Sequence, residues 1–183
     1  KLDPYKRVFD FENIILNDEA LQNSIFLIEK NTNTKIVVLT TSDYFGRGSD
    51  VDAAVEVGNQ NQIGKGYNGI ILLVSKANRK NCMQVETKLE GILPDQVCSR
   101  INKTGGKFFK VGDFDGGITQ ILSNLEIVLK DYKNQEEIYN NQKSVESSQI
   151  QQDKQNLSWL WDTLFVLIAS LLRNIFLQAA III

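Results

Sequence analysis

The sequence contains no histidine among its 183 residues. This absence excludes catalytic pairs of serine or cysteine with histidine, imidazole proton shuttles and every metal site that uses a histidine ligand. Carboxylates are therefore the general bases and metal ligands that remain. The chain also has only two cysteines, Cys82 and Cys98, which are too few for a zinc site or a disulfide scaffold. They either form one bridge in an oxidising compartment or are two separate buried thiols.

Concentrated charge is missing as well. The formal net charge is -2, with 20 basic and 22 acidic residues, and the basic residues are dispersed along the chain. A surface that binds nucleic acid needs clustered lysine and arginine to displace counterions from phosphates. We therefore expect no nucleic acid partner.

The most apolar stretch of the first two thirds of the chain is Ile-Ile-Leu-Leu-Val at residues 70–74. Five consecutive large apolar residues, several of them β-branched, predict a strand that is buried on both faces. Gly64, Gly66 and Gly69 before it spell the G-x-G-x-x-G pattern of dinucleotide-binding loops, in which the glycines follow a strand and open a helix. Here they precede the strand, which favours a glycine-rich turn, and no nucleotide ligand is expected.

The segments before this strand predict a β/α arrangement. Asn17 is a good N-cap for a helix with apolar residues at helical spacing that ends near residues 31–33. Residues 35–41 are typical of a second buried strand, and Ser49 and Asp50 can cap a short helix between the two strands. A strand, helix, strand order in one sheet predicts a right-handed parallel crossover.

The segments after the central strand complete the predicted domain. Residues 81–87 alternate between two faces, as in an antiparallel partner strand. Pro94 marks one helix start, and Asp113 can cap a last helix with a wide apolar stripe. We expect an α/β domain over residues 1–132, in which helices cover both faces of a mixed sheet.

Four short motifs follow one another in a fixed order within approximately residues 8–130. They are Gly64-x-Gly66-x-Asn68-Gly69 with the strand after it, Gln84-Val85-Glu86, Leu-Glu-Gly-Ile-Leu-Pro-Asp at 89–95, and Phe-Lys-Val-Gly-Asp-Phe at 109–114. This series resembles the TPM domain family. Its members include thylakoid-lumen proteins linked to photosystem assembly and repair, bacterial membrane-anchored homologues and an auxiliary subunit of a ligand-gated receptor. The resemblance implies an αβα sandwich outside the membrane, often followed by one membrane helix, and some members are described as acid phosphatases or as binding a divalent cation.

The chain departs from the family pattern near the implied cation site. Tyr67 stands where members usually have an acidic residue, and Thr87-Lys88 stands where they usually have Gly-x-Gly. A hard cation needs several oxygen ligands, so these changes weaken such a site. The carboxylates that remain as candidate metal or phosphate ligands are Glu86, Glu90, Asp95 and Asp113. In the alternative that we favour, the two aspartates cap helices, the two glutamates are solvated or paired with Lys88, and the protein has no cofactor.

The composition changes after the domain. Residues 133–156 are rich in Asn, Gln, Glu, Lys and Ser, which predicts a polar tether that continues the preceding helix or docks on a neighbouring protein. Residues 157–183 are mostly apolar. At 1.5 Å per residue they would extend about 40 Å, enough to cross a hydrocarbon layer of roughly 30 Å. We expect one transmembrane helix with Trp159 and Trp161 as interfacial anchors; the alternative is a buried amphipathic helix of a soluble protein.

Two charged residues interrupt this apolar segment. Asp162 and Arg173 are eleven residues apart, close to three helical turns, so they project from nearly the same face of a helix. Arg173 either extends to the lipid headgroups or both charges contact a partner helix, and we favour the partner helix. The expected partners are therefore the lipid bilayer and other subunits of a membrane complex, bound through the tether and the C-terminal helix.

Two functions compete at this point. The favoured one is a non-catalytic accessory or assembly subunit of an organellar membrane complex of the respiratory-chain type. The alternative is a membrane-tethered acid phosphatase-like hydrolase that uses carboxylates and a divalent metal. The first residue is Lys1 rather than methionine, which fits a cleaved targeting peptide or a segment outside this sequence. We expect a location in the mitochondrial inner membrane of a protist, with the thylakoid membrane as the alternative.

Overall fold

The computed structural model describes residue 3 and residues 5–42, 49–61 and 68–179. By internal contacts the chain divides into two units, Lys1–Asn134 and Gln135–Ile183. The elements, in chain order, are β1 (Val8–Asp10), α1 (Asp18–Thr32), β2 (Thr34–Thr40), α2 (Asp50–Asn61), β3 (Asn68–Ser75), β4 (Lys80–Val85), the short 3-10 helix η1 (Thr87–Leu89), α3 (Asp95–Phe109) and α4 (Phe114–Ala179).

The first unit is built on a four-stranded sheet with the strand order β1-β2-β3-β4. β1, β2 and β3 are parallel, and β4 pairs with β3 in the antiparallel direction. The predicted central strand is β3, in which Ile70 to Val74 are all at most 3% exposed. The mixed sheet, the parallel pairing across the α2 crossover and the antiparallel partner are confirmed.

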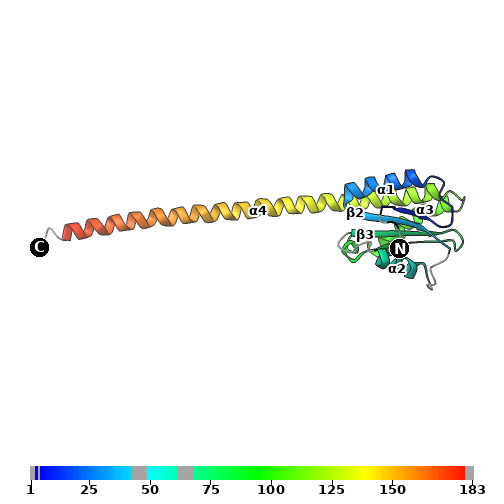
Figure 1. Cartoon of the computed structure of the whole chain (residues 1–183). Coiled ribbons are helices and arrows are strands. Elements are labelled where there is room, and N and C mark those ends of the chain that lie inside the picture. The colour runs from blue at the N-terminus through cyan, green and yellow to red at the C-terminus, as the bar shows by residue number, and fades with distance from the viewer. Residues whose placement is uncertain (1–2, 4, 43–48, 62–67, 180–183) are drawn as a thin grey trace. The chain divides into compact units, whose positions relative to one another are not determined.

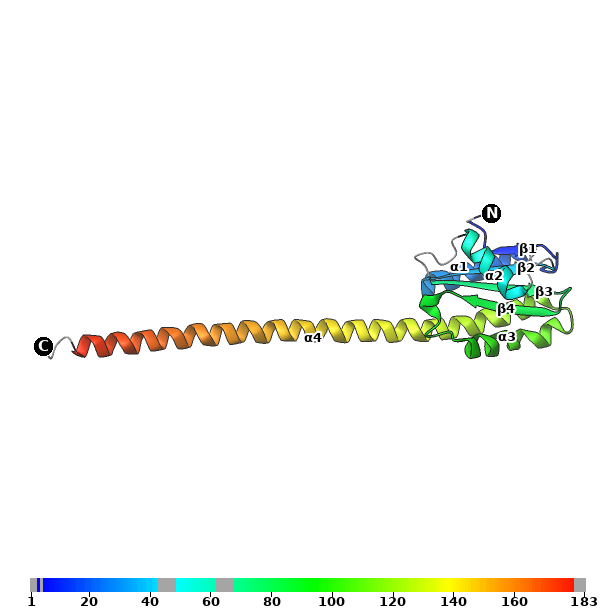
Figure 2. The same cartoon turned by 90° about the horizontal axis from the view of Figure 1, so that it is seen from below.

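Helices cover both faces of this sheet, as Figures 1 and 2 show. Because side chains alternate along a strand, even-numbered residues of β2 and β3 face one layer and odd-numbered residues face the other. The first layer contains α1, α3 and the start of α4, and its buried side chains include Ile25, Ile36, Leu72, Ile101 and Ile121. The second layer contains α2, whose Ala53, Ala54 and Val57 pack on Val37, Leu39, Ile71 and Leu73. The predicted αβα arrangement is therefore present.

The two parallel crossovers have opposite hands. The connections β1-α1-β2 and β2-α2-β3 step in the same direction across the sheet, but their helices lie on opposite faces. Connections between parallel strands are right-handed in nearly all known cases, so one of these two departs from the rule. β1 has only three residues, and its short pairing with β2 leaves most of the sheet to β2, β3 and β4.

Helix starts follow the capping rules at three of four predicted positions. Side-chain oxygens of Asn17, Ser49 and Asp113 accept backbone N–H groups of the first helical turn at 3.0, 3.1 and 2.8 Å. The fourth position, Asp95, does not cap α3, because Pro94 occupies the N-cap and no side-chain cap is formed. Asp95 lies in the first turn instead, where a negative charge interacts favourably with the helix dipole.

The second unit consists of the continuation of α4, a helix of 66 residues in all. The segment 133–156 is helical. Between residues 157 and 172 the exposed large apolar side chains are Leu157, Trp159, Leu160, Trp161, Leu164, Phe165, Val166, Leu167, Ile168, Leu171 and Leu172. In the part of the chain that the structure describes, no helix has a stretch that is both long enough and apolar enough to span a membrane. The last four residues of the predicted transmembrane segment, 180–183, lie outside that part.

Candidate functional site

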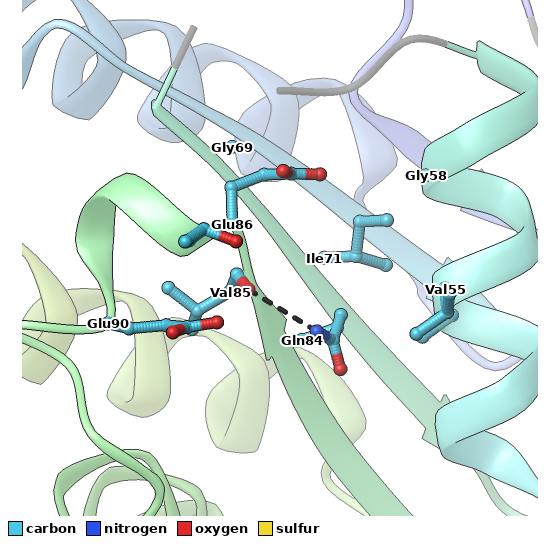
Figure 3. Close-up of a pocket in the computed structure, with 10 residues that line it drawn as sticks. Val55, Gly58, Gly69, Ile71, Gln84, Val85, Glu86 and Glu90 are labelled. Atoms are coloured by element: carbon cyan, nitrogen blue, oxygen red, sulfur yellow. Dashed lines mark hydrogen bonds between the residues drawn. The ribbon is translucent and has the colours of Figure 1, made fainter. Parts of the chain in front are cut away.

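Two of the predicted ligands, Glu86 and Glu90, line one cavity next to η1 (Figure 3). Glu86 follows β4 directly and donates its backbone N–H to the carbonyl of Gly69 at 2.9 Å. The cavity has a volume of about 180 Å³. We call it the carboxylate pocket; it is lined by Ala54, Val55, Gly58, Gly69, Ile71, Gln84, Val85, Glu86, Thr87 and Glu90.

The polar groups of the carboxylate pocket are few. Figure 3 shows the side chain of Gln84 donating through Nε2 to the carbonyl of Val85, at 3.3 Å. The opposite wall is apolar and comes from α2 and β3. Neither glutamate pairs with Lys88 or with any other cation of the described residues. Both carboxylates are therefore available as hydrogen-bond acceptors at the mouth of the pocket.

Asp95 lies beside a neighbouring hollow of about 350 Å³, which it shares with Glu90 and Cys98. Cys98 is only 6% exposed, and its Sγ donates to the carbonyl of Leu93 at 3.3 Å. Burial raises the pKa of the Cys98 thiol to about 11, and the negative charge of Asp95 adds to this rise. Cys98 is consequently a protonated thiol at neutral pH, which makes it a poor nucleophile and a poor metal ligand.

Asp113 lies at the other end of the sheet. It directly precedes Phe114, the first residue of α4, and the Phe114 ring lies next to the Nζ atom of Lys76, which follows the end of β3. Glu86 lies at the start of β3 instead, because its N–H binds the carbonyl of Gly69. Seven residues of extended strand separate these two ends, which is roughly 23 Å. The structure thus brings Glu86 and Glu90 together, places Asp95 next to Glu90, and separates Asp113 from all three.

The carboxylates do not converge in the way that a divalent cation needs. Among the residues described, no group of three or more aspartate, glutamate or cysteine side chains is placed to hold a metal ion. Calcium takes six to eight oxygen ligands, and magnesium takes six in a nearly octahedral arrangement. The described donor set therefore does not fit the cation that the family resemblance implies.

The two cysteines are separate thiols, which decides between the two alternatives for them. Cys82 packs against the α2 face of the sheet, and Cys98 belongs to the core on the opposite face. The sheet lies between them, and neither cysteine is in a disulfide.

Part of the glycine motif lies outside the described residues. Gly64, Gly66 and Tyr67 are not described, whereas Gly69 is a buried residue of β3. Gly64 and Gly66 come before β3 in the sequence, and Gly69 is its second residue.

Three other carboxylates, which the sequence analysis did not single out, stand at the carboxyl end of the parallel strands. Asp10 accepts the backbone N–H groups of residues 14 and 15 and the hydroxyl of Thr40. Glu12 accepts the N–H groups of residues 76 and 77, at 2.7 and 3.2 Å. Asp115 accepts those of residues 16 and 17, at 2.9 and 3.0 Å. These carboxylates connect loops to one another. Of the three, only Asp10 could have been assigned such a role from the sequence, because it stands at the end of a strand.

The predicted contact residues of the C-terminal segment all lie on α4. Trp159 and Trp161 are 65% and 68% exposed, and Asp162 and Arg173 are exposed as well. One continuous helix joins Asp162 and Arg173, so the two charges project from nearly the same face about 16 Å apart.

These features define an α/β sandwich domain with a four-stranded mixed sheet, followed by a long helix. The chain belongs to the TPM domain family, whose model matches residues 8–128. A comparison with curated proteins gave no match.

Solved structures of similar fold come from three bacteria. The N-terminal domain of a protein from P. gingivalis is 21% identical with a TM-score of 0.63, and the match covers 71% of this chain and 85% of that one. The N-terminal domain of the cg2496 protein from Corynebacterium glutamicum is 16% identical with a TM-score of 0.54, covering 66% and 78%. The BA42 protein from Bizionia argentinensis is 19% identical with a TM-score of 0.54, covering 67% and 86%. At these identities the likeness establishes the fold alone.

Proposed function

We propose that this protein is a non-catalytic accessory or assembly subunit of an organellar membrane complex of the respiratory-chain type. In this proposal the TPM domain is the water-facing part. The C-terminal part of α4 contacts lipid and neighbouring subunits, and the polar segment 133–156 connects the two. The proposed location is the mitochondrial inner membrane, with the thylakoid membrane as the alternative.

The observation that carries the proposal is the exposure of apolar side chains around α4 between residues 157 and 172. Residues 164–168 are five consecutive large apolar residues, each between 48% and 74% exposed. Successive residues of a helix are rotated by about 100°, so these five surround the helix axis completely. Water is an unfavourable environment for such a surface at about 25 cal/mol per Å², and lipid or other helices would cover it.

The two charged residues of this segment support contact with other subunits. Asp162 and Arg173 are too far apart to pair with each other, at about 16 Å along one helix. A charged group in an apolar environment is stabilised by a partner of opposite sign or by a water-filled cavity. A neighbouring helix with complementary charges would supply both partners on the one face that Asp162 and Arg173 share.

The test is to isolate the tagged full chain from its native membranes with a mild detergent and to identify the proteins that remain bound. We expect a defined set of membrane subunits, and we expect Arg173→Leu to lose most of them while the protein still folds. Lys143→Leu is the matched control, because it removes the same charge from an exposed position in the polar part of α4. Unchanged co-purification and unchanged membrane extraction with Arg173→Leu would contradict the proposal.

The competing hypothesis of a tethered phosphatase-like hydrolase is examined with the same preparation. Hydrolysis of p-nitrophenyl phosphate is measured with and without Mg²⁺ or Ca²⁺. The variants Glu86→Gln and Glu90→Gln remove the two carboxylates that share a pocket. We expect no metal-dependent turnover. Turnover that both variants abolish would establish catalysis and overturn the non-catalytic assignment.

A further inference from the structure

A second cavity lies at the opposite end of the β3–β4 pair from the carboxylate pocket, between the turn after β3 and the junction of α3 with α4. Its volume is about 720 Å³, within the range of roughly 300 to 1,000 Å³ that small-molecule sites occupy. We call it the cationic pocket.

The floor of the cationic pocket is apolar and consists of Val74, Phe109 and Phe114. Val74 is 1% exposed and Phe114 is 8% exposed. The ring of Phe109 stacks on that of Phe114, with 5.6 Å between the ring centroids. Because Val74 and Phe114 are almost fully buried, the partly buried ring of Phe109 supplies most of the apolar surface that a ligand could contact.

Four cations surround this floor, and no aspartate or glutamate lines the pocket. The four are Lys76, Arg79, Lys80 and Lys110. The Nζ atom of Lys76 lies 5.8 Å from the centroid of the Phe114 ring, so its charge is at the pocket itself. None of the four forms an ion pair with a carboxylate of the described residues. Their combined field favours a negatively charged group at the entrance.

Three acidic residues at this end of the sheet accept hydrogen bonds from the backbone. Glu12 accepts the N–H groups of residues 76 and 77. Asp113 accepts that of residue 116, and Asp115 accepts those of residues 16 and 17. These three carboxylates reduce the positive field around the pocket. Glu12 does so at its edge, because it accepts the N–H of the lining residue Lys76, whereas the donors to Asp113 and Asp115 lie outside the lining.

Gly106 lines the pocket. A Cβ atom added at Gly106 would have no neighbour within 4 Å, although the residue lies in the interior of α3. Glycine in a helix is less favourable than alanine by about 1 kcal/mol. At Gly105, next to it, the close approach of α4 explains the glycine; at Gly106 the space beside it belongs to the pocket.

We infer that the cationic pocket binds a small organic anion with an apolar body. The anionic head would pair with Lys80, Lys110 and their neighbours on the rim, and the apolar body would lie on Phe109 and Phe114. This inference is independent of the proposed function, because it uses no residue of the carboxylate pocket and none of the segment 157–172.

The probe is 2-naphthoate, titrated into the full chain in a non-ionic detergent with ¹⁵N-labelled glycine. The amide signals of Gly106 and Gly112 report directly on the pocket, because both residues line it. We expect saturable shifts of these two signals. The neutral analogue 2-naphthylmethanol, and acetate as the head alone, should each bind at least tenfold more weakly. Raising the salt concentration should weaken binding of 2-naphthoate, since ions screen the rim charges.

The double variant Lys80→Gln with Lys110→Gln should weaken binding of 2-naphthoate at least tenfold. The matched control is Lys30→Gln with Lys88→Gln, which removes two exposed charges outside the pocket lining and should leave the affinity within twofold. Gly106→Phe should abolish binding by filling the cavity, and the lysine variants test the pocket independently if that variant does not fold. Equal affinity for the neutral analogue, or full affinity in the Lys80 and Lys110 double variant, would overturn the inference.

Discussion

Cys98 provides a prediction at the scale of a single residue. Its thiol has a pKa of about 11 in the folded chain, against an ordinary value of 9.0, because burial disfavours the thiolate. Between these two values the unfolded chain loses this proton while the folded chain keeps it, so stability must fall as the pH rises. From pH 8 to pH 10.5 we expect this group alone to lower the free energy of unfolding by about 2 kcal/mol. Urea unfolding curves at the two pH values measure the change.

The control separates Cys98 from the other groups that titrate at high pH. Cys98→Ala should be less stable than the wild-type protein at pH 8, because it leaves a small cavity. Between pH 8 and pH 10.5, however, its free energy of unfolding should fall by about 2 kcal/mol less than that of the wild-type protein. Cys82→Ala should keep the full Cys98-linked loss. An identical pH dependence in the wild-type protein and Cys98→Ala would contradict this account of the thiol.

Side-chain roles were the least predictable feature from the sequence. Asn17, Ser49 and Asp113 could be assigned as helix caps, because a cap acts on N–H groups within the next three residues. Glu12 could not be assigned, because the N–H groups that it accepts are 64 and 65 residues away along the chain. The grouping of Glu86 with Glu90 was foreseeable, because they are only four residues apart in the sequence. Their distance from Asp113 was not, because it depends on the tertiary fold.

At the scale of helices, two adjacent glycines in α3 predict opposite effects of the same substitution. A Cβ atom at Gly105 would lie 2.8 Å from Cδ1 of Ile121 and 2.9 Å from the backbone oxygen of Gly117. Gly105→Ala therefore has to push α3 and α4 apart, and we expect a loss of about 1 to 3 kcal/mol in the free energy of unfolding.

Gly106→Ala is the matched control, because the added methyl group meets open space. Alanine is the better helix former, so this variant should be more stable than the wild-type protein by about 0.5 to 1 kcal/mol. Chemical denaturation of both variants measures the difference. Equal destabilisation by the two substitutions would show that α3 and α4 do not pack as closely as described.

The type and order of the elements followed from local patterns, and their pairing did so only in part. The apolar run at β3 and the alternation in β4 predicted a central strand with an antiparallel neighbour, and both are present. β1 was not among the predicted strands, since three residues carry too little pattern. Its strand character depends on β2, which pairs with it 30 residues away. The opposite hands of the two crossovers contradict the general rule from which a sequence-based prediction starts.

At the scale of the whole molecule, the core is confined to the first unit. Where the structure describes side-chain exposure, the buried apolar residues lie between Val8 and Leu129, and none of residues 130–173 is buried. A chain of residues 1–134 should therefore unfold at the same urea concentration as the full chain, with a free energy of unfolding within about 1 kcal/mol, because it retains the buried surface that determines stability.

A shorter chain is the control for this prediction. Residues 1–123 lack Leu125 and Leu129, which are 0% and 2% exposed, and each buried leucine contributes several kcal/mol. This chain should fail to show a cooperative transition in circular dichroism. A marked loss of stability in residues 1–134 would show that the second unit contributes to the fold of the first.

The position of α4 at the end of the domain also affects the protein while it is being synthesised. All four strands are complete at Val85, but Ile121 and Leu125, which close one side of the sheet, are added later. Leu125 follows Val85 by 40 residues, so translation at about 5 to 20 residues per second leaves that side without the start of α4 for roughly 2 to 8 seconds. During this interval one side of the sheet is incompletely covered, and exposed apolar strands of this kind are prone to associate with other chains until the first turns of α4 have been synthesised.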